Sequence, residues 1–598
     1  MPEQLTTDQI AVFSVLLITL ALFGWGKLRH DMVAIIALLA IVAFGLVPGQ
    51  DAFAGFGHPA VVTVAAVLVI SHALKNSGVV DLIARRLLPF TGNAFVHLVA
   101  LTGVVTVMSA FMNNVGALAL MLPVALATAA EHKRSPAMLL MPLAFGSILG
   151  GMTTMIGTPP NIIIAAYQAE RTGTGFGMFQ FSPVGVPVAL LGVLFVTIIG
   201  WRLIPKARLS QNPPQQLFQV EEYLTEVKVP EGNPLIGQSL AFVEPLHAGD
   251  IDVMGLARGN GLAQPVSAYH IIEQDDVYLL RSDPDGLKPV IDELGLELVT
   301  TEDKSFQKLA STDLVLAEGV VTPDSPLEGR TVAFLRRHTN RTVSLVALAR
   351  QGETVRRRLR RQLFRAGDIL LLEGPTETMV ETMSDLGLLP LAQRDLAIGR
   401  ERRVGAAVSI FGIAIALGVF GVLPLTVTFV MAIVAYILFG ILPVRHLYRE
   451  IDWPVIVLLG AMIPVGRALE TTGATDLIAN SIIGLTAGLP VVVILTLVLV
   501  VTMFLSDIIN NAATALVMAP ISLGIAEQLG VNPEAFLMSV AVGASCAFLT
   551  PIGHQSNTLV MGPGGYHFSD YWRMGLPLEI LIVAVAVPLL LVFWPLYQ

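Results

Sequence analysis

The chain has 598 residues, of which 54% are hydrophobic and 14% charged, and its mean hydropathy of +0.72 is typical of a membrane protein and excludes an ordinary soluble one. A single cysteine, Cys546, excludes an intramolecular disulfide and a multi-cysteine metal cluster. No Walker A, Gly-x-Ser-x-Gly or His-Glu-x-x-His sequence occurs, and nothing suggests nucleic-acid binding, so we expect neither ATP-driven transport nor an enzyme.

Three blocks follow one another along the chain: hydrophobic, polar and hydrophobic. We predict a first transmembrane repeat over residues 1–204, a polar insert over 205–400 and a second transmembrane repeat over 401–598. The first apolar run follows Glu3 and Asp8 and not a basic segment, so we expect it to be a span and not a cleaved signal.

Five membrane spans are expected in each hydrophobic block, because apolar segments of about 17–25 residues cross a bilayer. They are predicted at about 8–26, 31–48, 58–75, 136–168 and 183–204, then at 404–421, 425–442, 454–469, 533–562 and 576–596. The short amphipathic segments 79–89 and 474–485 are more typical of interfacial helices. A helical hairpin that enters and returns is predicted at about 94–129 and again at 488–527.

Each hairpin carries a pair of asparagines at its tip. Asn113 and Asn114 interrupt one apolar run, and Asn510 and Asn511 interrupt the other at a constant offset (510 − 113 = 397). Because carboxamides in hydrocarbon are costly unless their polar groups find partners, two matched pairs suggest one site built twice.

The fourth span of each block is interrupted by glycine, proline and polar residues. Gly157-Thr158-Pro159-Pro160-Asn161 interrupts the first, and Gly553-His554-Gln555-Ser556-Asn557 interrupts the second (557 − 161 = 396). Irregular backbone within a membrane is tolerated where it lines a cavity. We therefore predict discontinuous helices that face the hairpin tips.

Orientation follows from the odd number of spans, which requires the second repeat to be inverted if the insert stays on one side. With the insert in the cytoplasm, most Lys and Arg lie inside and only Arg171 and Arg467 lie outside. This predicts a cytoplasmic insert and both termini outside.

Helix N-termini at such a site suit an anion, while freed carbonyls and carboxamide oxygens suit a hard cation such as Na⁺. Asp507 is the only acid within either hairpin core and is a candidate cation ligand or proton carrier; the alternative is a buried carboxylate held by local N–H groups. Ala110 occupies its position in the first repeat, so the two cation sites should differ. His554 replaces Thr158 and either contacts substrate or has a packing or capping role.

The polar insert is itself a tandem repeat, in which Asn233-Pro234-Leu235 matches Ser325-Pro326-Leu327 (326 − 234 = 92). Short alternating strands followed by an amphipathic helix predict two small α+β domains, at 205–302 and 303–400.

With these tips and breaks, the sequence resembles the divalent-anion:sodium symporter (DASS) family of the ion-transporter superfamily, and the insert resembles two TrkA-C (RCK-C) domains. The resemblance implies two inverted repeats of five spans plus a re-entrant hairpin, an elevator mechanism, a homodimer in the cell inner membrane, Na⁺ as the coupling ion and a regulatory ligand or nucleotide on the insert. Asparagine replaces the family's first serine at each tip, and Val115 or Ala512 replaces its threonine. No Gly-x-Gly-x-x-Gly precedes the insert's domains, so a dinucleotide-binding partner domain is not expected.

The candidate site residues come from both tips and both breaks. The expected substrate-binding residues are Asn114, Thr158, Asn161, Asn511, His554, Ser556 and Asn557. The expected sodium ligands are Ser109, Asn113, Asn114, Gly157, Ser506, Asp507, Asn510, Asn511, Thr550 and Gly553.

The sequence therefore predicts a secondary active symporter for a small divalent anion, with sulfate favoured and a dicarboxylate next. Two alternatives stay open. One is a Na⁺/H⁺ exchanger of the same superfamily that uses Asp507 as the shared carboxylate, and the other is a TrkA-C-regulated ion channel. Proton-coupled sodium flux without anion would indicate the exchanger, and single-channel currents would indicate the channel.

Overall fold

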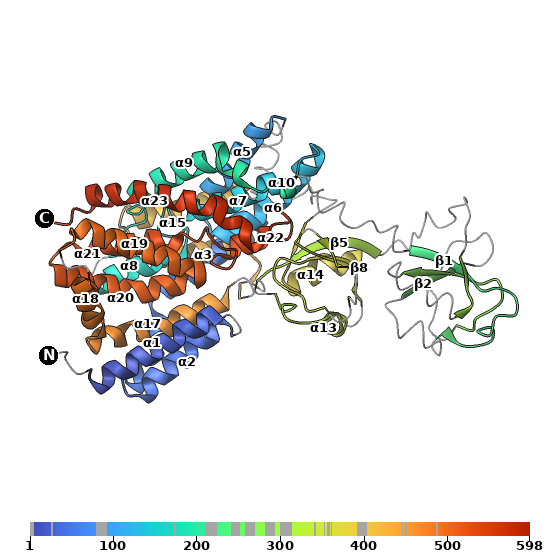
Figure 1. Cartoon of the computed structure of the whole chain (residues 1–598), viewed down its shortest axis with the longest axis horizontal. Helices are drawn as coiled ribbons and strands as arrows, with labels where there is room; N and C mark the ends of the chain where they lie inside the picture. The colour runs from blue at the N-terminus through green and yellow to red at the C-terminus, as the bar shows by residue number, and fades with distance from the viewer. Residues whose placement is uncertain are drawn as a thin grey trace. The chain divides into compact units, whose positions relative to one another are not determined.

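The structure is a computed structural model that describes residues 5–25, 28–78, 92–172, 175–209, 224–240, 252–257, 270–281, 294–298, 314–323, 325–339, 342–351, 353–355, 359, 362–391, 404–444, 447–448, 451–485 and 488–597. The chain forms two compact units. One is helical and combines Met1–Gln211 with Gln393–Gln598, and the other comprises Asn212–Ala392. Figure 1 shows the helical unit and the unit that contains the strands.

The helical unit contains the predicted apolar segments as helices. Those of the first repeat are α1 (Thr7–Trp25), α2 (His30–Ala43), α3 (Pro59–Asn76), α5 (Ala94–Ser109), α6 (Asn114–Glu131), α7 (Ala137–Gly151), α8 (Pro159–Thr172) and α9 (Ser182–Ile198). Those of the second are α15 (Val404–Val419), α16 (Leu425–Leu438), α17 (Trp453–Thr471), α18 (Ala474–Leu485), α19 (Val491–Ile508), α20 (Asn511–Leu529), α21 (Pro533–Ser545), α22 (Gln555–Met561) and α23 (Tyr571–Phe593). Within the described residues, seven helical segments are long and apolar enough to cross a membrane. The chain is a polytopic helical membrane protein, as predicted.

The two hydrophobic blocks build the same arrangement of helices. In the first, α5, α6 and α9 pack against α7, and in the second α19, α20 and α23 pack against α21. The first helices are exchanged, since α2 packs on α17 while α16 packs on α3. Both chain termini lie at the same end of the helical unit (Figure 1). This is expected where each repeat crosses an odd number of times.

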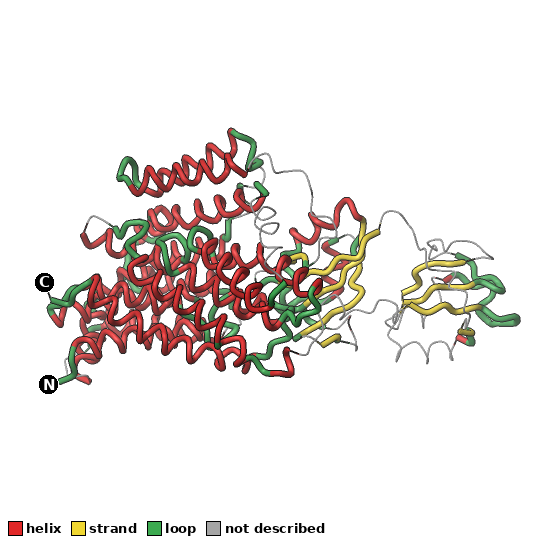
Figure 2. Tube along the Cα trace, turned by 90° about the horizontal axis from the view of Figure 1, so that it is seen from above, coloured by secondary structure: helices red, strands yellow, loops and turns green. Residues whose placement is uncertain are grey.

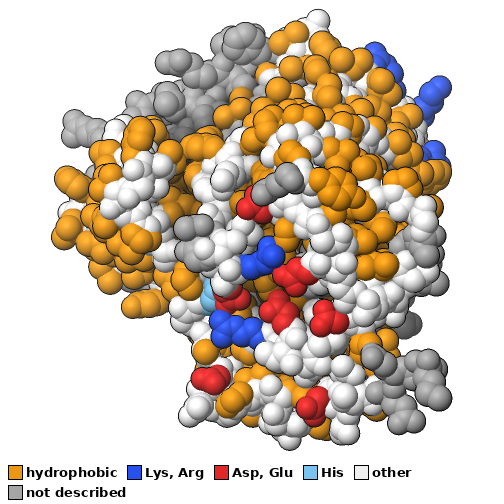
Figure 3. All heavy atoms as spheres, turned by 90° about the vertical axis from the view of Figure 1, so that its left-hand side faces the viewer, with side chains coloured by type: hydrophobic (Ala, Val, Ile, Leu, Met, Phe, Trp, Pro, Cys, Tyr) orange, Lys and Arg blue, Asp and Glu red, His pale blue; other side chains and the backbone are white. Residues whose placement is uncertain are grey.

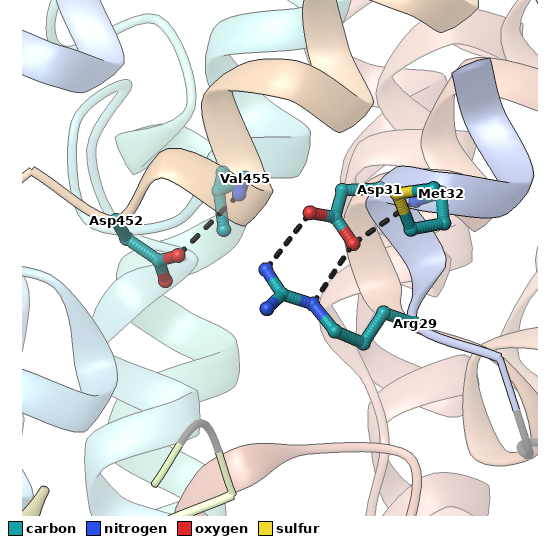
Figure 4. A network of polar contacts seen from close by, with 5 residues as sticks. All are labelled: Arg29, Asp31, Met32, Asp452 and Val455. Atoms are coloured by element: carbon teal, nitrogen blue, oxygen red, sulfur yellow. Dashed lines mark hydrogen bonds and ion pairs between the residues drawn. The ribbon is translucent and has the colours of Figure 1, made fainter. Parts of the chain in front are cut away.

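Acidic side chains lie at the starts of α2 and α17 (Figure 4). The carboxylate of Asp31 accepts from the Arg29 guanidinium at 2.9 and 3.2 Å and from the backbone N–H of Met32 at 3.0 Å. Asp452 caps α17 by accepting from the N–H of Val455 at 3.4 Å. Carboxylates suit these positions because a helix N-terminus carries unpaired N–H groups and partial positive charge.

The predicted interfacial segment at 474–485 is the helix α18, and the segment at 79–89 lies outside the described residues. The predicted spans at 136–168 and 533–562 are each divided into two helices. The gap between α7 and α8 runs from 152 to 158, and the gap between α21 and α22 runs from 546 to 554.

The other unit contains two antiparallel sheets (Figure 2). The first has β1 (Leu224–Lys228), β2 (Asp252–Ala257), β3 (Val277–Arg281) and β4 (Glu297–Leu298) in the order β2-β3-β1-β4. The second has β5 (Leu314–Val321), β6 (Ser344–Arg350), β7 (Glu353–Thr354), β8 (Ile369–Pro375) and β9 (Leu388–Pro390) in the order β7-β6-β8-β5-β9, with helices α13 (Val332–His338) and α14 (Thr376–Asp385).

The two sheets repeat each other strand by strand. Strands β1, β2, β3 and β4 correspond to β5, β6, β8 and β9, and the order across each sheet is the same. Both sheets also carry a register shift at one position, between Val253 and Gly255 and between Leu345 and Ala347. The separation of 345 − 253 = 92 is that of the sequence repeat, so the insert contains one β topology twice.

Candidate functional site

Each hairpin turns at its asparagine pair, and the first asparagine of the pair begins the returning helix. The side chain of Asn113 accepts from the N–H of Val115 at 3.1 Å, and that of Asn510 accepts from the N–H of Ala512 at 2.8 Å. Asparagine is a favoured N-cap because its short side chain reaches the unpaired N–H groups of the first turn. The structure thus gives these two predicted sodium ligands a capping role.

Hydroxyl groups attach both hairpins to the facing broken helices through equivalent hydrogen bonds. The pairs are Ser109 Oγ to Ser147 O at 2.6 Å and Ser506 Oγ to Ala544 O at 2.7 Å, then Thr154 Oγ1 to Ala110 O and Thr550 Oγ1 to Asp507 O at 2.7 Å. The internal symmetry therefore extends to single hydrogen bonds. Ser109, Ser506 and Thr550, which were predicted as sodium ligands, lie at these tip-to-break contacts.

The non-helical backbone of each break is supported by an asparagine that follows it. Asn161 Nδ2 donates to the carbonyl oxygens of Met152 and Thr154 at 3.4 and 2.9 Å. Asn557 Nδ2 donates to those of Ala547 and Thr550 at 2.8 and 3.1 Å. These bonds satisfy carbonyls that a continuous helix would have paired. Both asparagines were predicted to bind substrate; in the structure their amide nitrogens support the backbone of the breaks.

Close backbone approach explains the glycine in each break. A Cβ atom on Gly157 would lie 2.5 Å from the carbonyl oxygen of Gly151, and one on Gly553 would lie 2.6 Å from that of Ser506. A Cβ atom on Gly151 would itself lie 2.0 Å from the end of the Asn114 carboxamide. The backbones of each tip and its facing break therefore lie so close together that no side chain fits at these glycine positions.

A hydrogen bond between the repeats joins the first tip to the second break. The carboxamide of Asn114 and Nε2 of His554 lie 3.0 Å apart, with both side chains buried. Nδ1 of His554 accepts from the N–H of Ser556 at 3.0 Å, so the neutral ring carries its proton on Nε2 and donates it to Asn114. The end of the Asn114 carboxamide that faces His554 is then its oxygen.

The nitrogen of Asn114 correspondingly faces oxygen atoms of its own repeat. In this orientation it lies 2.8 Å from Ser109 Oγ, 3.0 Å from Gly157 O and 3.3 Å from Ser147 O, and it donates to them. Three oxygens from the hairpin and the broken helix thus converge on one atom. Oxygens converging in this way also suit a hard cation.

The second tip and the first break are not joined by an equivalent hydrogen bond between Asn511 and Thr158. Thr158, the counterpart of His554, is fully buried, and its hydroxyl has no hydrogen-bond partner within the described part of the chain. Asn511, the counterpart of Asn114, is 8% exposed, and its Oδ1 accepts from the N–H of Ala512 at 2.8 Å. Ser556 is buried, with its hydroxyl 3.3 Å from Ser147 Oγ. Thr158 and Asn511 therefore keep polar groups available to a ligand.

Asp507 lies at the end of α19, where one of its oxygens is held and the other is not. Oδ1 accepts from the N–H of Leu549 at 2.9 Å, whereas Oδ2 is buried and meets no donor among the described residues. The interpretation of Asp507 as a carboxylate held by local N–H groups thus accounts for half of the group only.

A second buried acid, Glu579 of α23, was missed by the sequence reasoning. It is 5% exposed, and its Oε1 accepts from the N–H of Phe548 at 3.4 Å. The signal was present, because Glu579 lies within the predicted span 576–596 and an acid inside a span is a functional candidate by default.

A cluster of charged side chains lies apart from the tips. Glu170 accepts from Arg467 at 2.6 Å and lies 3.3 Å from Nε2 of His58, beside a crevice also lined by Tyr167 and Leu516. Figure 3 shows acidic and basic side chains around a hollow on the face of the helical unit that carries the termini.

Hairpins whose polar tips meet broken helices inside an apolar helical unit define a membrane transporter. The family model described as citrate transporter matches residues 20–530 and 494–598, and the chain belongs to this family of the ion-transporter superfamily. An uncharacterized transporter of Synechocystis is 32% identical over 96% of this chain and 95% of its own length.

More distant relatives carry more specific names. The sodium/sulfate cotransporter 2 of Chlamydomonas reinhardtii is 26% identical over 61% of this chain and 42% of its own length. Among solved structures, the YdaH transporter of Alcanivorax borkumensis is 14% identical with a TM-score of 0.43, covering 99% of this chain and 100% of that chain.

Proposed function

We propose that the protein is a secondary active transporter that moves a small divalent oxyanion together with Na⁺, with sulfate as the first substrate and a dicarboxylate as the second. The hydrogen bond between Asn114 and His554 carries this proposal, because it joins the two half-sites into one buried polar locus. Sodium and sulfate are supported by the names of the Chlamydomonas relatives.

The donors around this locus suit an oxyanion. The Thr158 hydroxyl, the Asn511 carboxamide and the Nε2–H of His554 are all buried and uncharged. The helices α6 and α20 begin at the two tips, and the first turn of a helix has N–H groups without partners inside the helix. A compact anion bound by such donors needs no basic side chain. The positive charge that its transport requires comes from the coupling ion.

Sodium and anion binding are coupled, in this proposal, through the Asn114 carboxamide. With no cation, its nitrogen occupies the point where Ser109 Oγ, Ser147 O and Gly157 O converge. Sodium at that point requires the oxygen of Asn114 to turn inward, which places its nitrogen against the Nε2–H of His554. Two donors cannot pair, so the imidazole N–H is released to the anion.

Three further features of the resemblance belong to the proposal. The hairpins, broken helices and α9 or α23 move together as an elevator against α1–α3 and α15–α17. Two copies of the chain form a dimer. We place the insert in the cytoplasm, where it consists of two TrkA-C domains. These domains regulate transport by binding a small ligand or nucleotide. The repeated β topology supports a pair of like domains.

Uptake by proteoliposomes tests the function. Wild-type protein should accumulate labelled sulfate under an inward Na⁺ gradient, and it should accumulate less when K⁺ or choline replaces Na⁺. Competition by unlabelled succinate or citrate then reports the substrate specificity. Asn114→Ala should abolish uptake, whereas Gly116→Ala, two residues further along the same helix in open space, should not. Absence of sodium stimulation for sulfate, succinate and citrate alike would refute the proposal.

Na⁺/H⁺ exchange is the second candidate, and the free oxygen of Asp507 favours it. It predicts proton release on addition of sodium without any anion, and loss of that signal in Asp507→Asn. Sodium-dependent sulfate uptake without such a signal decides for symport.

A further inference from the structure

We infer that Glu579 is part of the second cation site, where it and Asp507 supply two carboxylates to one sodium ion. The inference rests on the proposed sodium coupling and adds a residue from α23, outside the hairpin and the break. Its consequence is that the two half-sites differ by two carboxyl groups.

The first step is the close approach of α23 to the second break. A Cβ atom on Gly575 would lie 2.2 Å from the carbonyl oxygen of Phe548, so only glycine permits this contact. Glu579 follows four residues later and lies on the same face of the helix. The glycine thus brings the Glu579 carboxyl to the backbone that also holds Asp507.

The second step is the geometry of the two acids. Adjacent N–H groups bind them, with Phe548 donating to Glu579 at 3.4 Å and Leu549 donating to Asp507 at 2.9 Å. One short segment of broken helix therefore holds both acids side by side.

The third step is the missing positive charge. Asp507 is 3% exposed and Glu579 is 5% exposed, and within the described residues neither forms an ion pair with a Lys, Arg or His. The other titratable group close to both is the buried thiol of Cys546, which is not cationic. Two buried like charges without a counter-ion are strongly unfavourable, so the pair either shares a proton or binds a cation, and the sodium dependence of the melting temperature separates these two cases.

The fourth step is the presence of unsatisfied oxygens. Asp507 Oδ2 is buried without a donor, and so is Oδ1 of Asn557, whose nitrogen is bound to the same break at Ala547 and Thr550. Oxygen atoms without donors are what a hard cation takes as ligands. The two orphaned atoms come from different elements, so they are independent signs of a ligand.

The first repeat provides the comparison. A Cβ atom on Gly185 of α9 would lie 2.3 Å from the carbonyl oxygen of Met152, which is the Gly575 contact repeated (575 − 185 = 390). At the same offset Glu579 corresponds to Ala189 (579 − 189 = 390), and at the offset of the hairpins Asp507 corresponds to Ala110 (507 − 110 = 397). The packing that would hold the pair is thus present in both halves, whereas the acids occur only in the second.

Sodium binding can be measured without any transported anion. The full-length protein in nanodiscs, in buffer free of sulfate and carboxylates, should gain thermal stability as NaCl replaces choline chloride at constant ionic strength, because a ligand that binds the folded state raises its melting temperature. Glu579→Gln should require at least about tenfold more sodium for half of this shift. Ala189→Gln, the matched first-repeat variant, should leave the sodium midpoint unchanged.

Three results would overturn the inference. One is an unchanged sodium midpoint in Glu579→Gln. Another is a wild-type melting temperature that responds to pH but not to sodium, which would assign the pair a shared proton. A third is an equal midpoint shift in Ala189→Gln. If Glu579→Gln does not fold, Glu579→Asp is the deciding variant because it keeps the carboxylate. Its melting temperature should still rise with sodium, and half of the rise should need more sodium than in the wild type. Sodium stabilisation in a protein that fails to transport sulfate would refute the substrate and leave this site intact.

Discussion

Glu170 of α8 and Arg467 of α17 are joined by a hydrogen bond of 2.6 Å, and His58 at the start of α3 lies 3.3 Å from the same carboxylate. These contacts connect α8, which follows the first break, to α17 and α3, which carry no break. The Arg467 side chain is 54% exposed and paired with Glu170.

We expect this pair to affect movement more than stability. An exposed ion pair contributes about 0.2–1 kcal/mol, so Glu170→Gln should lower the melting temperature only slightly. Glu170→Arg places like charges together and should lower uptake at least severalfold. Exchange of the two residues, Glu170→Arg with Arg467→Glu, should restore most of it. A double exchange as slow as the single variant would contradict a role for the pair.

His554 and Thr158 form a matched pair for mutation, because they occupy the same position in the two repeats. His554→Ala removes the bond to Asn114 and the helix cap on Ser556, so it should lower the free energy of unfolding by about 1–3 kcal/mol. Thr158→Ala removes a hydroxyl that bonds to no described residue and should leave thermal stability nearly unchanged while weakening sulfate affinity. Equal melting temperatures for wild type and His554→Ala would contradict the assignment.

Gly157 and Gly553 should be intolerant of alanine. The added methyl would lie 2.5 or 2.6 Å from a carbonyl oxygen of the backbone, which cannot move like a side chain, and overpacking of this kind costs about 1–3 kcal/mol. We expect either variant to lose more than about tenfold of sodium-driven uptake. Gly103→Ala, in open space on α5, is the control and should retain normal uptake and stability.

In the insert, Asp368 should be essential to the second sheet. It is 1% exposed and accepts from Arg350 at 2.7 Å through both oxygens and from the N–H of Arg365 at 2.8 Å. This hydrogen-bonded contact raises the pKa of the Arg350 guanidinium above its usual value. Asp368→Asn leaves that charge without its partner and should destabilise the domain by about 3–5 kcal/mol.

Hydrogen exchange of the full-length protein measures this effect. Amides of β6 and β8 should exchange faster in Asp368→Asn, whereas the exposed substitution Glu381→Gln should not change them. Unchanged protection of β8 in Asp368→Asn would show that the pair is not structural.

The sequence was sufficient to predict the helical class, the hairpins and the broken spans, since apolar length, glycine, proline and asparagine are local signals. It could not distinguish capping from ligation at Asn113 and Asn510, because both uses need the same carboxamide at the same turn. The bond between Asn114 and His554 joins residues 440 positions apart, and no local pattern reports such a contact. The position of Glu579 against Asp507 likewise depends on the approach of α23 at Gly575.

The exchanged packing of α2 on α17 and of α16 on α3 has a consequence for how the protein can be made. Each half covers an apolar helix of the other half. A half that is synthesised alone therefore leaves the apolar surfaces of these helices uncovered. A gene divided within the insert would therefore yield two polypeptides that assemble only when they are co-expressed. An ancestral single repeat with this packing would have needed a second copy in the opposite orientation before it could fold.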